Sequence, residues 1–138
     1  MEKISHATLF TQDEDDGLEM HDIKHHGDKP GGSFELDLRS SPFQAQIKFY
    51  FDDSTLRDFI KNLKKLEESL RGKVRLGNIY EQPYVQFEGN GMGHITVSGK
   101  LVSNDHWMQK LDFNFKTDQT ALGPFIKDLD VIMGHAPA

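Results

Sequence analysis

The sequence has no cysteine among its 138 residues, which excludes disulfide bonds, thiolate metal sites and a cysteine nucleophile. It also has no apolar run near the roughly 18 residues that a membrane-spanning helix needs. The first ten residues show neither the apolar core nor the cleavage pattern of a signal peptide. We therefore expect a cytoplasmic protein that does not act at a membrane.

Positive charge is also scarce: the sequence has 16 basic and 22 acidic residues, and its net charge is −6. This balance argues against direct nucleic-acid binding through bulk charge. The excess is local: residues 1–32 hold eight acidic and three basic residues, a net charge of −5. The remaining residues, 33–138, are nearly neutral, so the acidity belongs to the first quarter of the chain.

Hydrophobic periodicity predicts the elements of an α+β domain. Apolar residues alternate with polar ones over 34–38 and again over 43–51, with Ser41 and Pro42 between them, which predicts an antiparallel hairpin. The period then changes to 3.6 between Leu56 and Leu70, which predicts a helix that begins near Asp53 or Ser54 and ends before Gly72.

Four more strand-like stretches follow, over residues 74–80, 84–88, 94–102 and 107–116. A second helix is expected from about Ala121, because Thr120 as its N-cap would place Pro124 where no helical hydrogen bond is lost. The Gly-rich segment Gly89–Gly93 is followed by a strand pattern, so it predicts a hairpin turn and not a phosphate-binding loop.

The expected architecture is a single antiparallel sheet of about six strands with both helices on one face, in the order ββαββββα. In this interpretation residues 1–31 are an acidic segment that is partly ordered or holds one short strand, and residues 32–138 form a single α+β domain. Because the clear apolar alternation begins at Phe34, deleting residues 1–30 is expected to leave a cooperative fold.

Histidines gather in the acidic segment. On a helix, His21 and His25 would share one face, with His26 nearby, and could bind Zn²⁺ or Ni²⁺. Asp22 and Asp28 also lie nearby, but no apolar period supports a helix there and no distant fourth ligand is evident, so a polar surface is favoured. We expect no metal, cofactor or catalytic residue. A second hypothesis, a small-ligand-binding or hydrolytic domain, would place a cleft between helix and sheet, near His94 or His106.

Several short motifs and their order resemble WapI-type immunity proteins, small bacterial proteins encoded beside toxins of the wall-associated, contact-dependent type. The resemblance covers about residues 32–133. It rests on Gly32-Ser33-Phe34-Glu35-Leu36, Leu56-Arg57-Asp58-Phe59 with Leu63 and Leu66, Gly93-His94-Ile95-Thr96-Val97, and Leu111-Asp112-Phe113-Asn114-Phe115 before Asp118-Gln119-Thr120-Ala121-Leu122.

The resemblance implies a binding module that neutralises a cognate polymorphic toxin and has no catalytic activity of its own. Many such toxins are nucleases with basic grooves, and an acidic inhibitor would associate with them faster. The acidic segment is then the candidate contact, with Asp13, Glu14, Asp15, Asp16 and Glu19 as the expected partner-binding residues.

Overall fold

Eight strands and two helices make up the part of the chain that the structure, a computed structural model, describes: residues 6–11, 15–25, 31–77, 83–103 and 109–133. The first four strands and first helix are β1 (Ala7–Leu9), β2 (Gly17–His25), β3 (Gly32–Ser40), β4 (Phe43–Phe51) and α1 (Asp53–Ser69). The remaining elements are β5 (Arg71–Gly77), β6 (Tyr84–Asn90), β7 (His94–Val102), β8 (Lys110–Asp118) and α2 (Gln119–Ile132).

The strands form two antiparallel sheets of four, so the expected single six-stranded sheet is wrong. Sheet A has the order β1-β2-β3-β4 and sheet B the order β5-β6-β7-β8. The order ββαββββα lacked two strands before Gly32. With β1 and β2 in place, the β3–β4 hairpin has its own partners, so it does not need to pair with the strands after α1.

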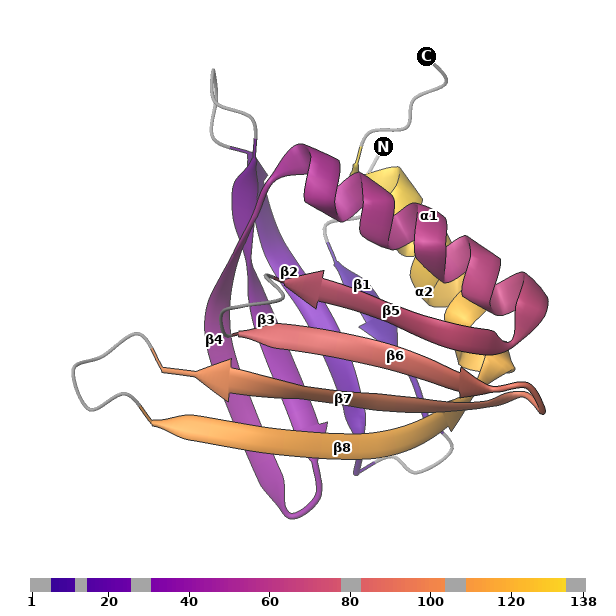
Figure 1. Ribbon diagram of the computed structural model, residues 1–138. Coiled ribbons are helices and arrows are strands. Elements are labelled where there is room, and N and C mark those ends of the chain that lie inside the picture. Colours follow the sequence, from indigo (N-terminus) through magenta and orange to yellow (C-terminus); the bar gives the residue numbers. More distant parts are fainter. Residues whose placement is uncertain (1–5, 12–14, 26–30, 78–82, 104–108, 134–138) are drawn as a thin grey trace.

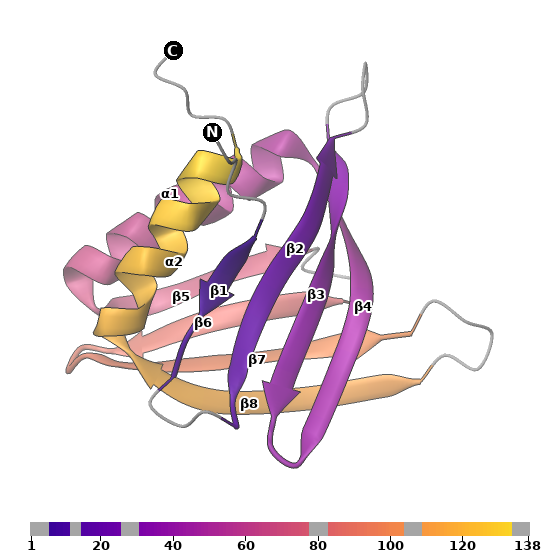
Figure 2. The ribbon, with the colours of Figure 1, turned by 180° about the vertical axis from the view of Figure 1, so that it is seen from behind.

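The described chain is a twofold repeat of four strands and a helix. Each helix packs beside the first strand of a sheet: α1 lies along β5, α2 lies along β1, and the helices contact each other. Figures 1 and 2 show the strands of the two sheets running across each other, with both helices on one side. The helices therefore fill the space between β1 and β5, while β3 and β8 meet elsewhere.

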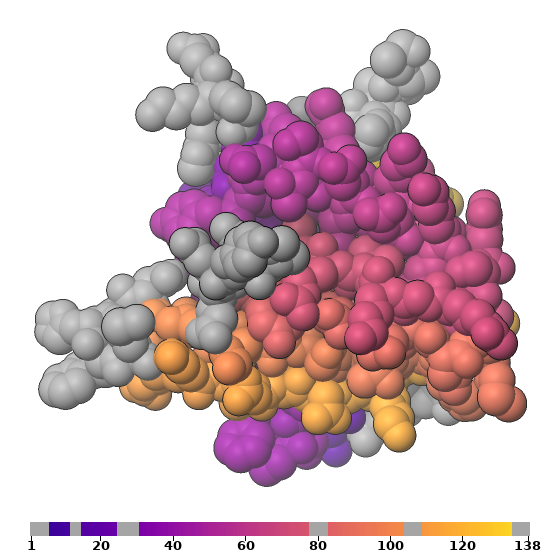
Figure 3. All heavy atoms as spheres, viewed as in Figure 1, coloured from indigo at the N-terminus to yellow at the C-terminus, as the bar shows by residue number. Residues whose placement is uncertain are grey.

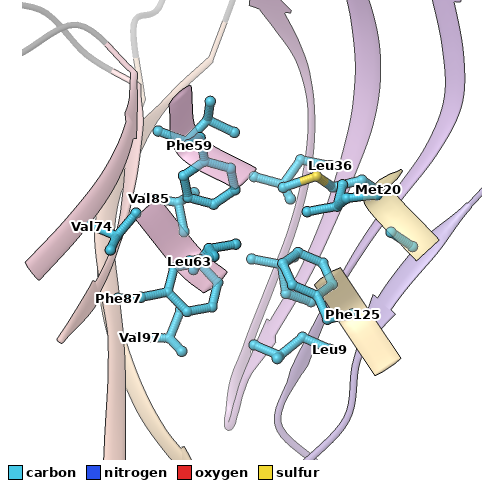
Figure 4. Close-up of a cluster of buried hydrophobic side chains, with 14 of the residues drawn as sticks. Leu9, Met20, Leu36, Phe59, Leu63, Val74, Val85, Phe87, Val97 and Phe125 are labelled. Carbon is cyan, nitrogen blue, oxygen red and sulfur yellow. The ribbon is translucent and has the colours of Figure 1, made fainter. Parts of the chain in front are cut away.

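The core lies between the two sheets and the helices. Figure 4 shows Val85 and Phe87 of sheet B facing Met20 and Leu36 of sheet A, with rings of both helices between them. The Phe87 ring lies 5.8 Å from Phe59 of α1 and 5.9 Å from Phe125 of α2, measured between centroids. These rings fill the space between helix and sheet where the second hypothesis placed a ligand cleft.

Local chemistry explains where the helices begin and end. Helix α2 begins two residues before the expected Ala121, because Asp118 is its N-cap and accepts a hydrogen bond from the Thr120 backbone N–H at 3.0 Å. Pro124 therefore lies inside the helix. Helix α1 is capped by Asp52 without a side-chain hydrogen bond, and Leu70 ends it in the left-handed conformation, with φ of 61°.

The Gly-rich segment is the hairpin turn that the sequence predicted. It joins β6 to β7, which pair antiparallel. The Asn90 side chain accepts hydrogen bonds from the backbone N–H groups of Met92 at 2.8 Å and His94 at 3.3 Å. Gly91 takes a positive φ of 86°, which a residue with a Cβ rarely adopts.

Candidate functional site: the outer face and loop end of sheet A

The predicted acidic residues lie at two places on sheet A. Asp13 and Glu14 fall outside the described residues. Asp15 and Asp16 lie in the loop between β1 and β2, and Glu19 lies on the outer face of β2. Asp16 accepts a hydrogen bond from the Ser41 backbone N–H at 2.8 Å, so this carboxylate ties the loop to the β3–β4 turn.

Two exposed aromatic rings flank this loop. Phe10 is 66% exposed and Phe43 is 60% exposed, so both present large apolar side chains to solvent. Phe10, Thr11, Asp16 and Arg39 line one surface hollow of about 330 Å³. We call this region, made by Phe10, Asp15, Asp16, Arg39 and Phe43, the loop end of sheet A. Figure 3 shows the β3–β4 turn projecting below the strands of sheet B.

A row of polar side chains crosses the outer face of sheet A next to the loop end. Thr8, Glu19, Asp37 and Gln46 are consecutive cross-strand partners on β1 to β4. The Thr8 hydroxyl donates to Glu19 Oε2 at 3.0 Å. This row lines a hollow of about 540 Å³, together with Arg39 and Gln44.

His21 lies one pleat further along β2, held between two carboxylates. Its Nε2 is 2.9 Å from Asp37 Oδ2 and its Nδ1 is 3.2 Å from Asp22 Oδ2. Partial burial lowers the pKa of His21, but the charges and hydrogen bonds of Asp37 and Asp22 raise it more, so the net pKa lies above 6.5. His21 is therefore placed to exchange a proton or to act as a ligand.

A β-bulge places Asp22 beside His21. The register between β2 and β3 shifts between His21 and Lys24, and Asp22 takes a left-handed φ of 52°. Because β2 is a strand, the helical pairing of His21 with His25 that the sequence suggested does not occur. The side chain of His25 and all of His26 lie outside the described residues.

The contact among Glu19, His21 and Asp37 was not predicted from the sequence. The alternation Leu18-Glu19-Met20-His21 was a signal for a strand with two polar residues on its outer face. Asp37 could be placed on the outer face of its own strand in the same way. The register between the two strands was not available, and only that register brings the three side chains together.

The two sheets carry opposite charge. The strands of sheet A hold four acidic and three basic residues, a net charge of −1, whereas the strands of sheet B hold three acidic and six basic residues, a net charge of +3. With Asp15 and Asp16 of the adjoining loop, the net charge of sheet A is −3. On sheet B, the Arg75 guanidinium stacks over the Tyr84 ring at 4.0 Å and donates to Gln86 Oε1 at 2.9 Å. The net charge of −6 is therefore not spread evenly over the molecule.

His94, which the second hypothesis placed in a cleft, lies on sheet B. It lines a surface hollow of about 330 Å³ with Asn90, Thr96 and Lys116. His106 falls outside the described residues. Within the described part of the chain, no helix is long and apolar enough to cross a membrane.

The fold and the site together define an α+β protein of two crossed four-stranded sheets whose net charges have opposite sign. The same fold occurs in a solved structure described as "Crystal structures of trypanosoma bruciei MRP1/MRP2", with a TM-score of 0.52 and 10% identity over 94% of this chain and 83% of that chain. At this identity the likeness concerns the fold alone. A search of curated proteins finds no match.

The family follows from the sequence. The profile of the Immunity protein WapI-like family matches residues 18–137, which is most of the chain. The protein therefore belongs to the WapI-like immunity protein family, as the resemblance over residues 32–133 predicted. The match begins in β2, so it includes the strand that carries Glu19 and His21.

Proposed function

We propose that the protein is a cytoplasmic immunity protein that binds and neutralises a cognate bacterial polymorphic toxin without catalysis. The observation that carries this proposal is the family match over residues 18–137. The absence of cysteine agrees with the cytoplasm as its compartment.

We further propose that the toxin binds at the loop end of sheet A. Exposed aromatic rings surrounded by polar groups are typical of the residues that dominate binding energy, and Phe10 and Phe43 have this setting. The net charge of −3 on sheet A would attract a basic surface, such as the substrate groove of a nuclease. The acidic residues then contribute mainly to the association rate. This proposal covers Asp13, Glu14, Asp15, Asp16 and Glu19.

Co-expression with the toxin encoded by the neighbouring gene tests the function. We expect the cells to survive and a complex to elute from a size-exclusion column. A toxin that stays lethal, with no complex recovered, would contradict the proposed function.

Paired variants test the location of the interface. Phe43→Ala should weaken binding about tenfold or more, which corresponds to about 1.4 kcal/mol, and Asp15→Lys should slow association, more strongly at low salt. The matched controls lie on sheet B and its turn: Met92, which is 80% exposed, for the aromatic ring, and Asp112 for the carboxylate. If Met92→Ala weakens binding as much as Phe43→Ala does, and Asp112→Lys slows association as much as Asp15→Lys does, the loop end of sheet A is not the interface. This result would leave the proposed function unaffected.

A further inference from the structure

We propose that Glu19, His21 and Asp37 form a binding site for a divalent transition-metal ion on the outer face of sheet A. One donor atom from each residue lies within 4.8 Å of the other two. Glu19 and His21 project from the same face of β2, two residues apart, and Asp37 is the direct partner of Glu19 on β3. Two paired strands therefore hold all three donors.

The spacing of the donors fits a single ion. Metal–ligand bonds of about 2.0–2.1 Å at angles between 90° and tetrahedral place neighbouring ligand atoms roughly 2.9–3.4 Å apart. His21 Nε2 and Asp37 Oδ2 are separated by 2.9 Å. An ion can therefore replace the proton that these atoms share, and the Glu19 donor atom lies within 4.8 Å of both of them.

The other nitrogen of His21 already has the partner that metal-bound histidines have. A histidine that binds a metal through one ring nitrogen usually donates from the other to a carboxylate, which fixes the ring and its tautomer. Asp22 provides this carboxylate, with Oδ2 3.2 Å from Nδ1. The imidazole is thereby held with Nε2 directed at Asp37, where the ion would lie.

Asp37 supplies an independent observation. Its Oδ1 atom is shielded from solvent, and no donor among the described residues lies within hydrogen-bonding distance of it. Buried carboxylate oxygens rarely lack a partner, and a bound ion is one of the few arrangements that satisfies one. Although 42% of the Asp37 side chain is exposed, Oδ1 is thus without a partner among the described residues, and Oδ2 can bind a cation in place of its hydrogen bond to His21.

The donor set selects the kind of ion. One imidazole nitrogen and two carboxylates suit Zn²⁺, Mn²⁺ or Fe²⁺, whereas Mg²⁺ and Ca²⁺ favour sites made of oxygen alone. Three protein ligands leave a coordination position open. Because Glu19 and Asp37 also line the hollow of about 540 Å³, water or a side chain of a bound partner can take that position.

Calorimetric titration of the metal-stripped, untagged chain with ZnCl₂ tests the site. We expect one high-affinity ion per chain, and at least a tenfold loss of affinity in each of Glu19→Gln, His21→Gln and Asp37→Asn. Glu88→Gln and His94→Ala are matched controls, since they replace the same residue types at exposed positions on sheet B and should bind as the wild type does.

Crystals of the wild type soaked in Zn²⁺ give a second measurement that does not depend on the folding of a variant. Anomalous scattering at the zinc edge should lie between Glu19, His21 and Asp37. An anomalous peak elsewhere, or wild-type chain that takes up no Zn²⁺, overturns the proposal. The same conclusion follows if Asp37→Asn binds normally while His25→Ala or His26→Ala does not.

Discussion

The imidazole of His21 is held by Asp37 and Asp22, and this arrangement has a consequence for stability. The pKa of His21 is raised in the folded protein above its unfolded value of 6.5. A raised pKa means that the protonated ring stabilises the fold. This contribution is fully present below pH 6.5 and is lost as the pH rises through the folded pKa.

NMR titration of the metal-free protein checks this prediction. We expect the ring resonances of His21 to titrate above pH 6.5, and the free energy of unfolding to fall over the same interval. In Asp37→Asn, whose side chain has no charge, the pKa of His21 should decrease and most of this pH dependence should disappear. A wild-type pKa below 6.5 would contradict the geometry of the cluster.

Phe87, on β6 of sheet B, contacts both helices. Its side chain is fully buried between Phe59, to which its ring is tilted by 58°, and Phe125, on which it stacks. Phe87→Ala should lower the free energy of unfolding by about 3–5 kcal/mol, because it leaves a cavity that neither helix can fill. Chemical denaturation measures the loss, and Phe43→Ala, on an exposed ring, should change stability by less than about 0.5 kcal/mol.

At the level of single residues, burial could be predicted from the sequence, whereas contacts between residues of different strands could not. Alternation of apolar and polar residues correctly assigned Phe34, Leu36 and Leu38 to the core. Burial on one face of a strand can be read from the sequence of that strand alone. The contact between His21 and Asp37 depends on the register of two strands and on a bulge. Neither is a property of a single segment, so the candidate site could be predicted only as a region of acidic residues.

The two helices begin in different ways, and this difference gives a matched test. Asp118 caps α2 with a hydrogen bond to Thr120, whereas Asp52 caps α1 with no side-chain bond. Asp118→Ala should therefore lower the free energy of unfolding by about 1 kcal/mol, and Asp52→Ala by a few tenths. Equal effects in thermal unfolding would show that the cap hydrogen bond does not account for the stability of α2.

Elements with their own periodicity were predicted well. The β3–β4 hairpin, α1 and β7 lie where alternation and the 3.6-residue period placed them. The division into two sheets was not predicted, because strand pairing is decided by partners far along the chain. Strands β1 and β2 went unrecognised as partners, since β1 has three residues and β2 carries charges beside its two buried apolar side chains.

Strands β1 and β2, which lie in the acidic segment, contribute side chains to the core of the molecule. Ala7, Leu9, Leu18 and Met20 are at most 2% exposed, and α2 packs on β1. We expect deletion of residues 1–30 to abolish cooperative unfolding, contrary to the expectation from the sequence pattern. Urea denaturation followed by near-ultraviolet circular dichroism measures this. A cooperative transition in the deleted protein would instead establish residues 32–138 as the folded domain.

Among the described residues, two side-chain hydrogen bonds join sheet A and the loop after β1 to sheet B. The Ser40 hydroxyl donates to the Asn114 carbonyl and the Thr117 hydroxyl donates to the Phe10 carbonyl, each at 3.0 Å. Both hydroxyl side chains are nearly buried. Since a buried hydroxyl that loses its partner costs about 1–3 kcal/mol, these bonds help to fix how sheet A lies relative to sheet B.

The packing of α2 against β1 also determines when the chain can fold during synthesis. Residues 7–9 of β1 leave the ribosome well before the helix that covers them, which spans residues 119–132. Until that helix has emerged, the edge of sheet A stays open to the surroundings and to chaperones. The nascent chain therefore acquires its final structure only after residue 132 has been translated, and a ribosome stalled before residue 119 carries an incomplete core.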